Sequence, residues 1–124
     1  MVYDQQNIFA KILRNEIPCN KVYEDQYALA FHDLNPSAPV HVLFIPKGEF
    51  ISFSHFIDTA NHNFIASFFT SVRRVIEILE IENSGYRIIS NCGSDGMQTV
   101  YHFHIHILGK KRLGALVSGD NFHA

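Results

Sequence analysis

Residues 101 to 109 read YHFHIHILG, and three of the eight histidines in the chain occupy alternate positions within this stretch. Successive side chains of a β-strand point to opposite faces of a sheet, so a strand over Val100 to Leu108 would place His102, His104 and His106 on one face. The opposite face would carry Tyr101, Phe103, Ile105 and Ile107. Because a shift of one residue would expose this apolar set to water, its burial would fix the register of the strand.

Apolar spacing predicts two helices. The first has Asp4 as its expected N-cap and ends before Pro18, and its apolar residues recur at helical spacing: Ile8, Phe9, Ile12 and Leu13. The second runs from about residue 58 to residue 81 along a continuous apolar stripe.

Four further strands are predicted over residues 21–24, 27–33, 40–46 and 86–91. Most of the consecutive strands are joined by short links, which favours antiparallel pairing over repeated βαβ units. The sequence therefore predicts an α+β fold, with a five-stranded antiparallel sheet and two helices packed against it.

The chain has 124 residues, of which 47% are apolar, and this is enough to bury one core. We expect a single domain over residues 1–124, with a tail without strong pattern over residues 110–124. A net charge of -2 argues against binding to a nucleic acid polymer, but a single nucleotide needs only local donors.

The apolar runs are too short to span a bilayer, and the first residues lack the pattern of a secretory signal. We therefore expect a cytoplasmic protein without a membrane partner. Cys19 and Cys92 are far apart and show no metal-binding spacing, so both are expected to be free thiols.

Three uses of the histidine row are open on the residues alone. A metal ion is one, but His102 and His106 would lie roughly 13 Å apart on a strand that rises about 3.3 Å per residue, and no carboxylate stands at a recognisable ligand spacing. A solvated strand without chemistry is another. The third is nucleophilic catalysis, because a neutral imidazole can attack phosphorus while a neighbouring imidazole donates a proton. Such a pair predicts a bell-shaped pH–rate profile in the histidine range.

The stretch HFHIHIL resembles the His-φ-His-φ-His-φ-φ motif of the histidine triad (HIT) superfamily of nucleotide hydrolases and transferases, where φ is apolar. IFAKILRNEIP, YALAFHDLNPSAPVHVLFIPK and GYRIISNCGSDGMQTVYHFHIHILG are similar to the histidine triad nucleotide-binding branch, the nucleoside phosphoramidases. The resemblance implies a homodimer in which two five-stranded sheets join into one. It implies no cofactor and no metal.

The resemblance also implies catalytic roles. His104 would be the nucleophile that forms a covalent nucleotidyl-histidine, and His106 would contact the phosphate oxygens. His102 would fix the tautomer of His104, His41 would reach the cluster from the neighbouring strand, and Thr99 would supply a hydroxyl donor. Without the resemblance, a partly buried structural histidine is the favoured interpretation of His41, and an ordinary strand residue is the alternative for Thr99.

For nucleotide binding, the resemblance implies that Asp33 accepts hydrogen bonds from the ribose hydroxyls, although an acid beside Asn35-Pro36 also suits a turn. The other expected nucleotide-binding residues are Ile8, Phe9, Ile12, Phe31, His32, Leu34, Asn91, Met97 and Gln98. Without the resemblance, a core role is the favoured interpretation of the apolar members of this set.

The implied function is hydrolysis of purine nucleoside 5'-phosphoramidates or aminoacyl-adenylates at the α-phosphorus, with AMP, GMP or their amidates as ligands. Hydrolysis of dinucleoside polyphosphates, or a nucleotide-binding module with incidental catalysis, are the alternatives. The sequence departs from the nucleoside phosphoramidase branch at two places that bear on the choice of leaving group. Met97 stands where relatives commonly have glycine, and the chain has no tryptophan where many relatives place one near the C-terminus.

Overall fold

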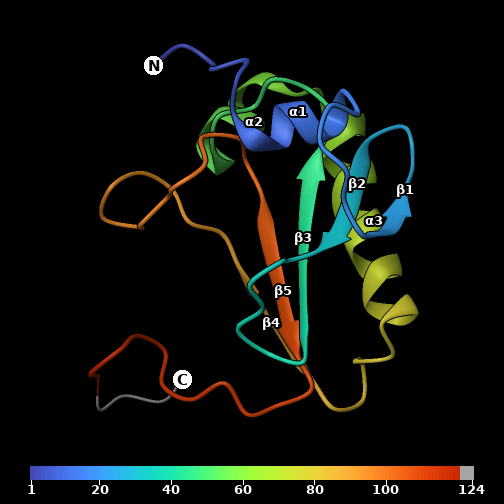
Figure 1. Cartoon of the computed structure of the whole chain (residues 1–124), viewed down its shortest axis with the longest axis vertical. Coiled ribbons are helices and arrows are strands. Elements are labelled where there is room, and N and C mark those ends of the chain that lie inside the picture. The colour runs from blue at the N-terminus through green and yellow to red at the C-terminus, as the bar shows by residue number, and fades with distance from the viewer. Residues whose placement is uncertain (121–124) are drawn as a thin grey trace.

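The computed structural model describes residues 1–120 and contains a five-stranded sheet with the strand order β1-β2-β3-β5-β4 (Figure 1). Every neighbouring pair of strands is antiparallel. The predicted α+β fold is therefore confirmed. The strands are β1 Lys21–Glu24, β2 Ala28–His32, β3 Val40–Pro46, β4 Tyr86–Ile89 and β5 Ile105–Gly109.

The described residues form three helices instead of the two expected: α1 Ile8–Leu13, α2 Phe53–Thr59 and α3 His62–Ile78. The helix predicted from about residue 58 joined the end of α2 to α3. The two are separate because each has its own N-cap, with the side chains of Ser52 and Asn61 accepting hydrogen bonds from backbone N–H groups. Helix α2 was missed because its 7 residues are too few to establish a period.

The N-cap of α1 is Asn7, not Asp4. The Asn7 side-chain oxygen accepts a 2.9 Å hydrogen bond from the N–H of Ala10, whereas the Asp4 carboxylate accepts from the N–H of Gln6 in the turn before the helix. The helix therefore begins one turn later than the position of Asp4 predicts.

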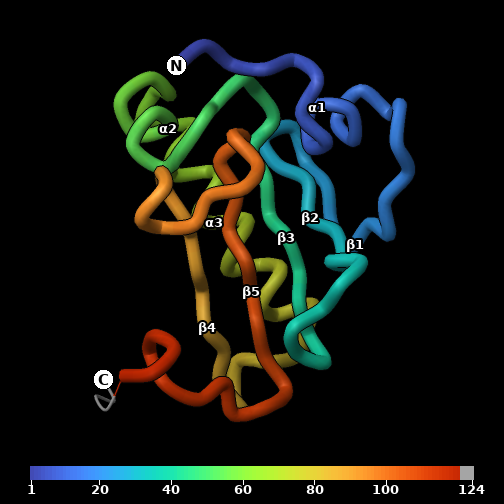
Figure 2. The backbone as a smooth tube through the Cα atoms, turned by 60° about the vertical axis from the view of Figure 1, so that its left-hand side comes forward, coloured from blue at the N-terminus to red at the C-terminus, as the bar shows by residue number. Residues whose placement is uncertain are grey.

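Apolar side chains cover both faces of the central strands. Ala28, Ala30, Val42 and Phe44 belong to the core that includes α2 and α3. The alternate residues of the same strands, Leu29, Phe31, Leu43 and Ile45, belong to a second core that includes Phe9 and Ile12 of α1. Strands β2 and β3 are consequently buried on both sides, and Figure 2 shows the helices distributed about the sheet.

Strand β5 begins at Ile105, so the strand predicted from Val100 was wrong at its start. Continuing the pairing of Phe44 with Ile105 would bring Pro46 opposite Phe103, and proline has no N–H to continue the ladder. The N–H of Phe103 donates instead to the carbonyl of Phe50 at 2.6 Å. His102 and His104 thus precede the strand, and of the three only His106 lies on it.

The alternation of side chains persists through this irregular segment. Phe103, Ile105 and Ile107 are buried in the core beneath α2 and α3. On the other side, the ring of Phe9 packs edge-on against the rings of His102 and His104. Tyr101 departs from the expectation, because it is half-buried and lines a surface hollow with N-terminal residues.

Residues 110–120 contain no helix or strand. The Arg87 guanidinium of β4 donates hydrogen bonds to the carbonyls of Gly114 and Ala115 at 3.1 and 3.4 Å, which ties this segment to the sheet. The last part of the tail predicted over residues 110–124, residues 121–124, lies outside the described residues. Over residues 1–120, no helix is both long enough and apolar enough to cross a membrane.

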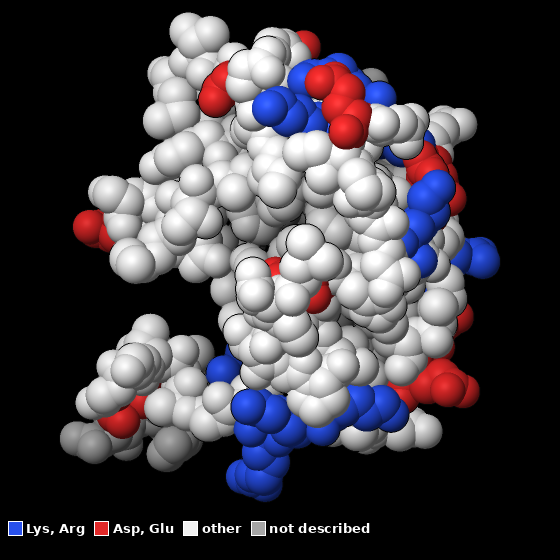
Figure 3. Space-filling view, viewed as in Figure 1, with Lys and Arg blue, Asp and Glu red and all other residues white. Residues whose placement is uncertain are grey.

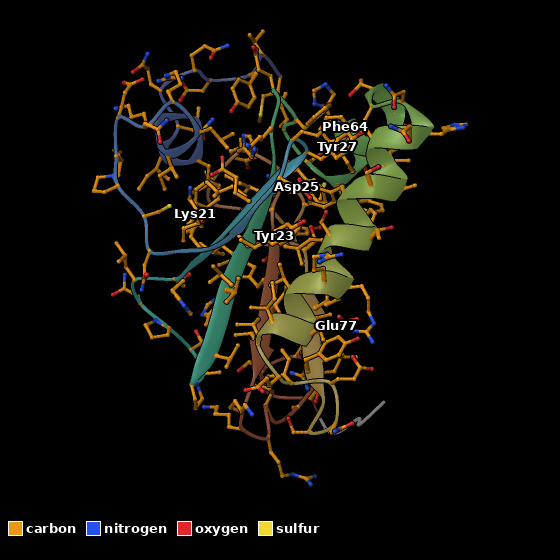
Figure 4. The ribbon with its side chains drawn as sticks, turned by 90° about the vertical axis from the view of Figure 1, so that its right-hand side faces the viewer. Lys21, Tyr23, Asp25, Tyr27, Phe64 and Glu77 are labelled. Carbon is orange, nitrogen blue, oxygen red and sulfur yellow. The ribbon has the colours of Figure 1, made fainter. Side chains whose placement is uncertain are left out.

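A carboxylate network joins the β1–β2 hairpin to α3. Asp25 accepts hydrogen bonds from the Tyr23 hydroxyl, the Ser71 hydroxyl of α3 and the N–H groups of Tyr27 and Ala28. Figure 4 shows Tyr23 and Asp25 on the hairpin beside α3. Burial raises the pKa of Asp25, but these hydrogen bonds outweigh burial and hold that pKa below its ordinary value.

We expect Asp25→Asn to lower the free energy of unfolding by about 1–3 kcal/mol at pH 7, because the amide can satisfy fewer of these donors. A lowered carboxyl pKa stabilises the fold above the unfolded pKa of about 3.9 and ceases to do so as pH falls through the folded pKa. Urea titrations should therefore show the difference from wild type shrinking below about pH 4. An equal difference at pH 3 and pH 7, or an equal loss in Asp58→Asn at an exposed carboxylate, would contradict this account.

Candidate active site

A cavity of about 580 Å³ lies between α1, the segment after β2 and the loop that precedes the histidine row. Its volume suits a small organic ligand. Asp33 is the only Asp, Glu, Lys or Arg among the described residues that line it. Figure 3 likewise shows the face seen in Figure 1 as largely uncharged, with Lys and Arg side chains gathered along its lower edge.

The cavity brings together twelve of the fifteen predicted site residues. They are Ile8, Phe9, Ile12, Phe31, His32, Asp33, Leu34, Asn91, Met97, Thr99, His104 and His106. The remaining three, His41, His102 and Gln98, are buried behind the lining.

Sequence reasoning missed several lining residues, among them Ile17, Pro18, Cys19 and Asn20. These residues follow α1 and carry the chain to β1. Their position could have indicated this role, because they directly follow a helix whose apolar residues were already assigned to the site. Pro18 was interpreted only as a helix stop, and this interpretation hid its second role as a wall of the cavity.

His104 is oriented by a hydrogen bond between its Nδ1 and the backbone carbonyl of His102, at 2.7 Å. A carbonyl can only accept, so Nδ1 carries the proton and Nε2 keeps its lone pair. The side chain is 6% exposed, and Phe9 packs edge-on against its ring at 4.9 Å between centroids. The arrangement presents a neutral imidazole with a fixed tautomer to the cavity.

A hydrogen bond from His41 fixes the tautomer of His106. The N–H of Ser37 donates to His41 Nδ1 at 3.0 Å, so the proton of neutral His41 is on Nε2. His41 Nε2 lies 2.9 Å from Nδ1 of His106 and donates to it. Neutral His106 therefore carries its proton on Nε2, and this side chain lines the cavity beside His104, with 5.1 Å between ring centroids.

Asp33 completes this chain of polar groups. Its Oδ2 lies 3.5 Å from His41 Nε2, and its Oδ1 accepts a 2.8 Å hydrogen bond from the N–H of Asn35. The carboxylate caps the turn and also lines the cavity, and its contact with a ribose stays a prediction. Its partly exposed oxygens keep further acceptor capacity for a ligand.

Burial governs the protonation of the histidine row. Burial lowers the pKa of His104 despite the hydrogen bond from its ring to the His102 carbonyl. Burial, together with the neighbouring His104 and His41, lowers the pKa of His106 to about 4. Burial also lowers the pKa of His102 to about 4. The three imidazoles are therefore neutral at pH 7.

The loop from Asn91 to Thr99 is folded by its own side chains. Gln98, expected to contact the nucleotide, is buried and uses its amide within the loop. Its Nε2 donates to the carbonyl of Ile51 at 2.7 Å, and its Oε1 accepts from the N–H of Gly93 at 3.1 Å. Asn91 Nδ2 donates to the carbonyl of Gly96 at 2.6 Å. The structure therefore places Gln98 as a support of the loop and not in the cavity wall.

Met97 has a left-handed backbone conformation, with φ of 61°. This region is unfavourable for residues other than glycine. The Met97 side chain is 76% exposed at the rim of the cavity, so packing does little to compensate for the strain. The expected glycine at this position therefore has a physical reason, and the methionine retains the backbone shape at a cost in stability.

The HIT domain family matches the chain over residues 14–113, a range that contains the histidine row, Asp33 and His41. This chain belongs to the HIT domain family. An uncharacterized 13.2 kDa HIT-like protein from Azospirillum brasilense is 48% identical over 116 residues, which cover 94% of this chain and 95% of that protein. A 14 kDa zinc-binding protein from Zea mays is 40% identical, over 89% of this chain and 86% of that protein.

Solved HIT structures share the fold. A histidine triad protein from Clostridium difficile is 39% identical with a TM-score of 0.82, covering 92% of this chain and 98% of that one. A HIT family hydrolase from Clostridium thermocellum is 36% identical with a TM-score of 0.78, covering 90% of this chain and 96% of that one. A histidine triad nucleotide-binding protein from Candida albicans is 28% identical with a TM-score of 0.74, covering 82% of this chain and 73% of that one.

Replacing Met97 by glycine should stabilise this HIT domain by about 0.5–1.5 kcal/mol, because glycine adopts a positive φ without strain while its greater freedom in the unfolded chain offsets part of the gain. Thermal or urea unfolding measures the change. Met97→Ala is the matched control, since it removes the same side chain but keeps the strained backbone. A stabilisation of the same size in the alanine variant would contradict the conformational explanation.

Proposed function

We propose that this HIT protein is a nucleotide-binding hydrolase of the nucleoside phosphoramidase type, which cleaves purine nucleoside 5'-phosphoramidates or aminoacyl-adenylates at the α-phosphorus. The observation that carries the proposal is the fixed tautomer of His104, whose Nε2 lone pair belongs to a buried, neutral imidazole at the cavity wall. A nucleophile for phosphorus needs such a lone pair at neutral pH.

The cavity has the parts that a nucleotide requires. Phe9, Ile12 and Phe31 form an apolar wall for a base, and Asp33 offers oxygens to the ribose hydroxyls. Thr99 and the loop before it lie beside the histidines, where hydroxyl and N–H donors can meet phosphate oxygens. A nucleotide bound in the proposed way would have its α-phosphorus next to His104.

Two displacements at one phosphorus complete the proposed reaction. In the first, the His104 Nε2 lone pair forms a bond to the α-phosphorus as the P–N bond to a leaving amine or the P–O bond to a leaving aminoacyl carboxylate breaks. The amine takes up a proton from water as it leaves, whereas the carboxylate leaves as the anion. His106 Nε2–H donates a hydrogen bond to the phosphate oxygens as charge develops on them. In the second, a water oxygen attacks the same phosphorus and releases a proton to solvent, while the P–N bond to His104 breaks and its electron pair returns to Nε2. The nucleoside monophosphate leaves. The histidine returns to its starting tautomer.

Metal binding is the specific alternative that the geometry raises. Asp33, His41 and His106 each offer one ligand atom, and these atoms lie within 4.8 Å of one another. The maize relative is named for zinc. His41 and His106 already hydrogen-bond to each other, and Asp33 accepts a hydrogen bond from the N–H of Asn35, which favours the metal-independent reaction. Dinucleoside polyphosphates remain the alternative substrate, and nucleotide binding without turnover the alternative function.

His104→Ala should reduce release of AMP from adenosine 5'-phosphoramidate by at least about a thousandfold, because the covalent step loses its nucleophile. His62→Ala, at an exposed position on α3, is the matched control and should retain activity. Each protein is assayed with and without excess EDTA. Turnover that EDTA abolishes would support the metal alternative, and turnover of a diadenosine polyphosphate in place of the phosphoramidate would change the substrate class.

The pH dependence of kcat/KM follows from the lowered histidine pKa values. An imidazole with a depressed pKa stays neutral below the ordinary value of about 6.5, so kcat/KM should stay level as pH falls from 8 to 6.5 and decline only in more acidic solution. The acid limb of the expected bell-shaped pH–rate profile is thereby displaced to lower pH. A decline with its midpoint at or above pH 6.5, in protein that circular dichroism shows to be folded, would contradict the assignment.

We also propose that two copies pair through β4. This strand is at the edge of the sheet, and Tyr86 and Ile88 are 39% and 46% exposed on it. An exposed edge with apolar side chains invites pairing with a second strand, which would extend the sheet across a homodimer. The free thiols of Cys19 and Cys92 suit a reducing compartment, and we propose the cytoplasm as the location.

Ile88→Glu should convert the dimer to a monomer, because a two-fold axis would bring the two new carboxylates close together. Sedimentation equilibrium measures the mass. Ile78→Glu is the control, since Ile78 is 50% exposed but belongs to α3 and not to the edge strand β4. A wild type that is monomeric at micromolar concentration, or a mass unchanged by Ile88→Glu, would contradict pairing through β4.

A further inference from the structure

The N-terminal segment reaches the histidine row through Tyr3. The Tyr3 hydroxyl lies 2.6 Å from Nδ1 of His102, a residue 99 positions later in the chain. The two rings meet edge-on, with 5.7 Å between centroids. Tyr3 lies outside residues 14–113, the range that matches the HIT family, and it does not line the cavity. This contact is therefore additional to the part of the chain that the family defines.

The partners of His102 settle the direction of this hydrogen bond. His102 Nε2 lies 3.0 Å from the carbonyl of Pro46, which can only accept, so Nε2 carries the proton. The ring is fully buried and neutral, and Nδ1 therefore has a lone pair. The Tyr3 hydroxyl donates to it. Both nitrogens of His102 are satisfied, and removal of the hydroxyl would leave a buried acceptor without a partner.

We infer that Tyr3 is a positioning residue for His104, acting through the orientation of His102. This inference rests on the proposed function for its catalytic consequence. The backbone carbonyl of His102 transmits the effect, because it accepts a 2.7 Å hydrogen bond from Nδ1–H of His104. A shift of His102 therefore moves the acceptor that fixes the nucleophile, whereas Tyr3 itself does not line the cavity.

The kinetic consequence is a separation of kcat from KM. A displaced nucleophile slows the covalent step, and misplacement by about 1 Å can cost up to about a hundredfold. Because Tyr3 does not touch the cavity, nucleotide affinity should not change. We expect Tyr3→Phe to lower kcat about tenfold and to leave KM within about twofold.

The test uses the full chain with Tyr3→Phe, and Tyr27→Phe as the matched control. Tyr27 also loses one hydroxyl contact, a 3.0 Å hydrogen bond from Asn63, but it packs against Phe64 of α3, away from the cavity (Figure 4). Long-range ¹H–¹⁵N spectra of the histidine rings give a second readout that needs no turnover. In Tyr3→Phe the His102 Nδ1 and His104 Nδ1 resonances should both shift, and in Tyr27→Phe neither should.

The outcomes separate this inference from the proposed function. Unchanged His104 resonances with unchanged kcat would overturn the positioning role. An equal loss of kcat in Tyr27→Phe, in step with a lowered unfolding midpoint, would also overturn it, because general destabilisation would then explain the effect. A wild type that does not hydrolyse adenosine 5'-phosphoramidate would instead refute the proposed function. The His104 resonances would still decide whether Tyr3 positions that ring.

Discussion

The hydrogen bond from His104 Nδ1 to the His102 carbonyl is the constraint on which the site depends. It requires the backbone at His102 to be free of the sheet, because a carbonyl engaged in a ladder is less available to a side chain two residues later. Pro46 meets this requirement by ending the pairing of β3 with β5. The proposed chemistry therefore follows from where a strand stops, and the histidine pattern alone does not supply it.

The double burial of the central strands creates the space around that bond. One face of β2 and β3 packs into the core beneath α3, and the other supplies Phe31 and Leu43 to the cavity beneath α1. This packing and the hydrogen bonds of the three rings hold the imidazoles in place. The same burial depresses their pKa values. Burial therefore both shapes the cavity and keeps the imidazoles neutral.

Much of this could be predicted from the sequence, because alternation and apolar runs report directly on strands and their faces. The sheet, the cavity wall from α1 and the cluster of His41 with His106 follow from local patterns and the family motif. The start of β5, the separate helix α2 and the buried role of Gln98 could not be predicted, since each depends on contacts between distant segments. The sequence shows that Pro46 has no N–H group. The residue that would lie opposite Pro46, Phe103, is known only from the register of β3 with β5.

The most direct test is to identify the covalent intermediate. Wild-type protein is mixed with adenosine 5'-phosphoramidate, quenched in alkali within one turnover, digested and analysed by fragmentation mass spectrometry, because a phosphorus–nitrogen bond to histidine survives in base. The account predicts one nucleotidyl group on His104 and none on His102 or His106. An adduct on another residue, or complete turnover without an adduct at any time point, would contradict it.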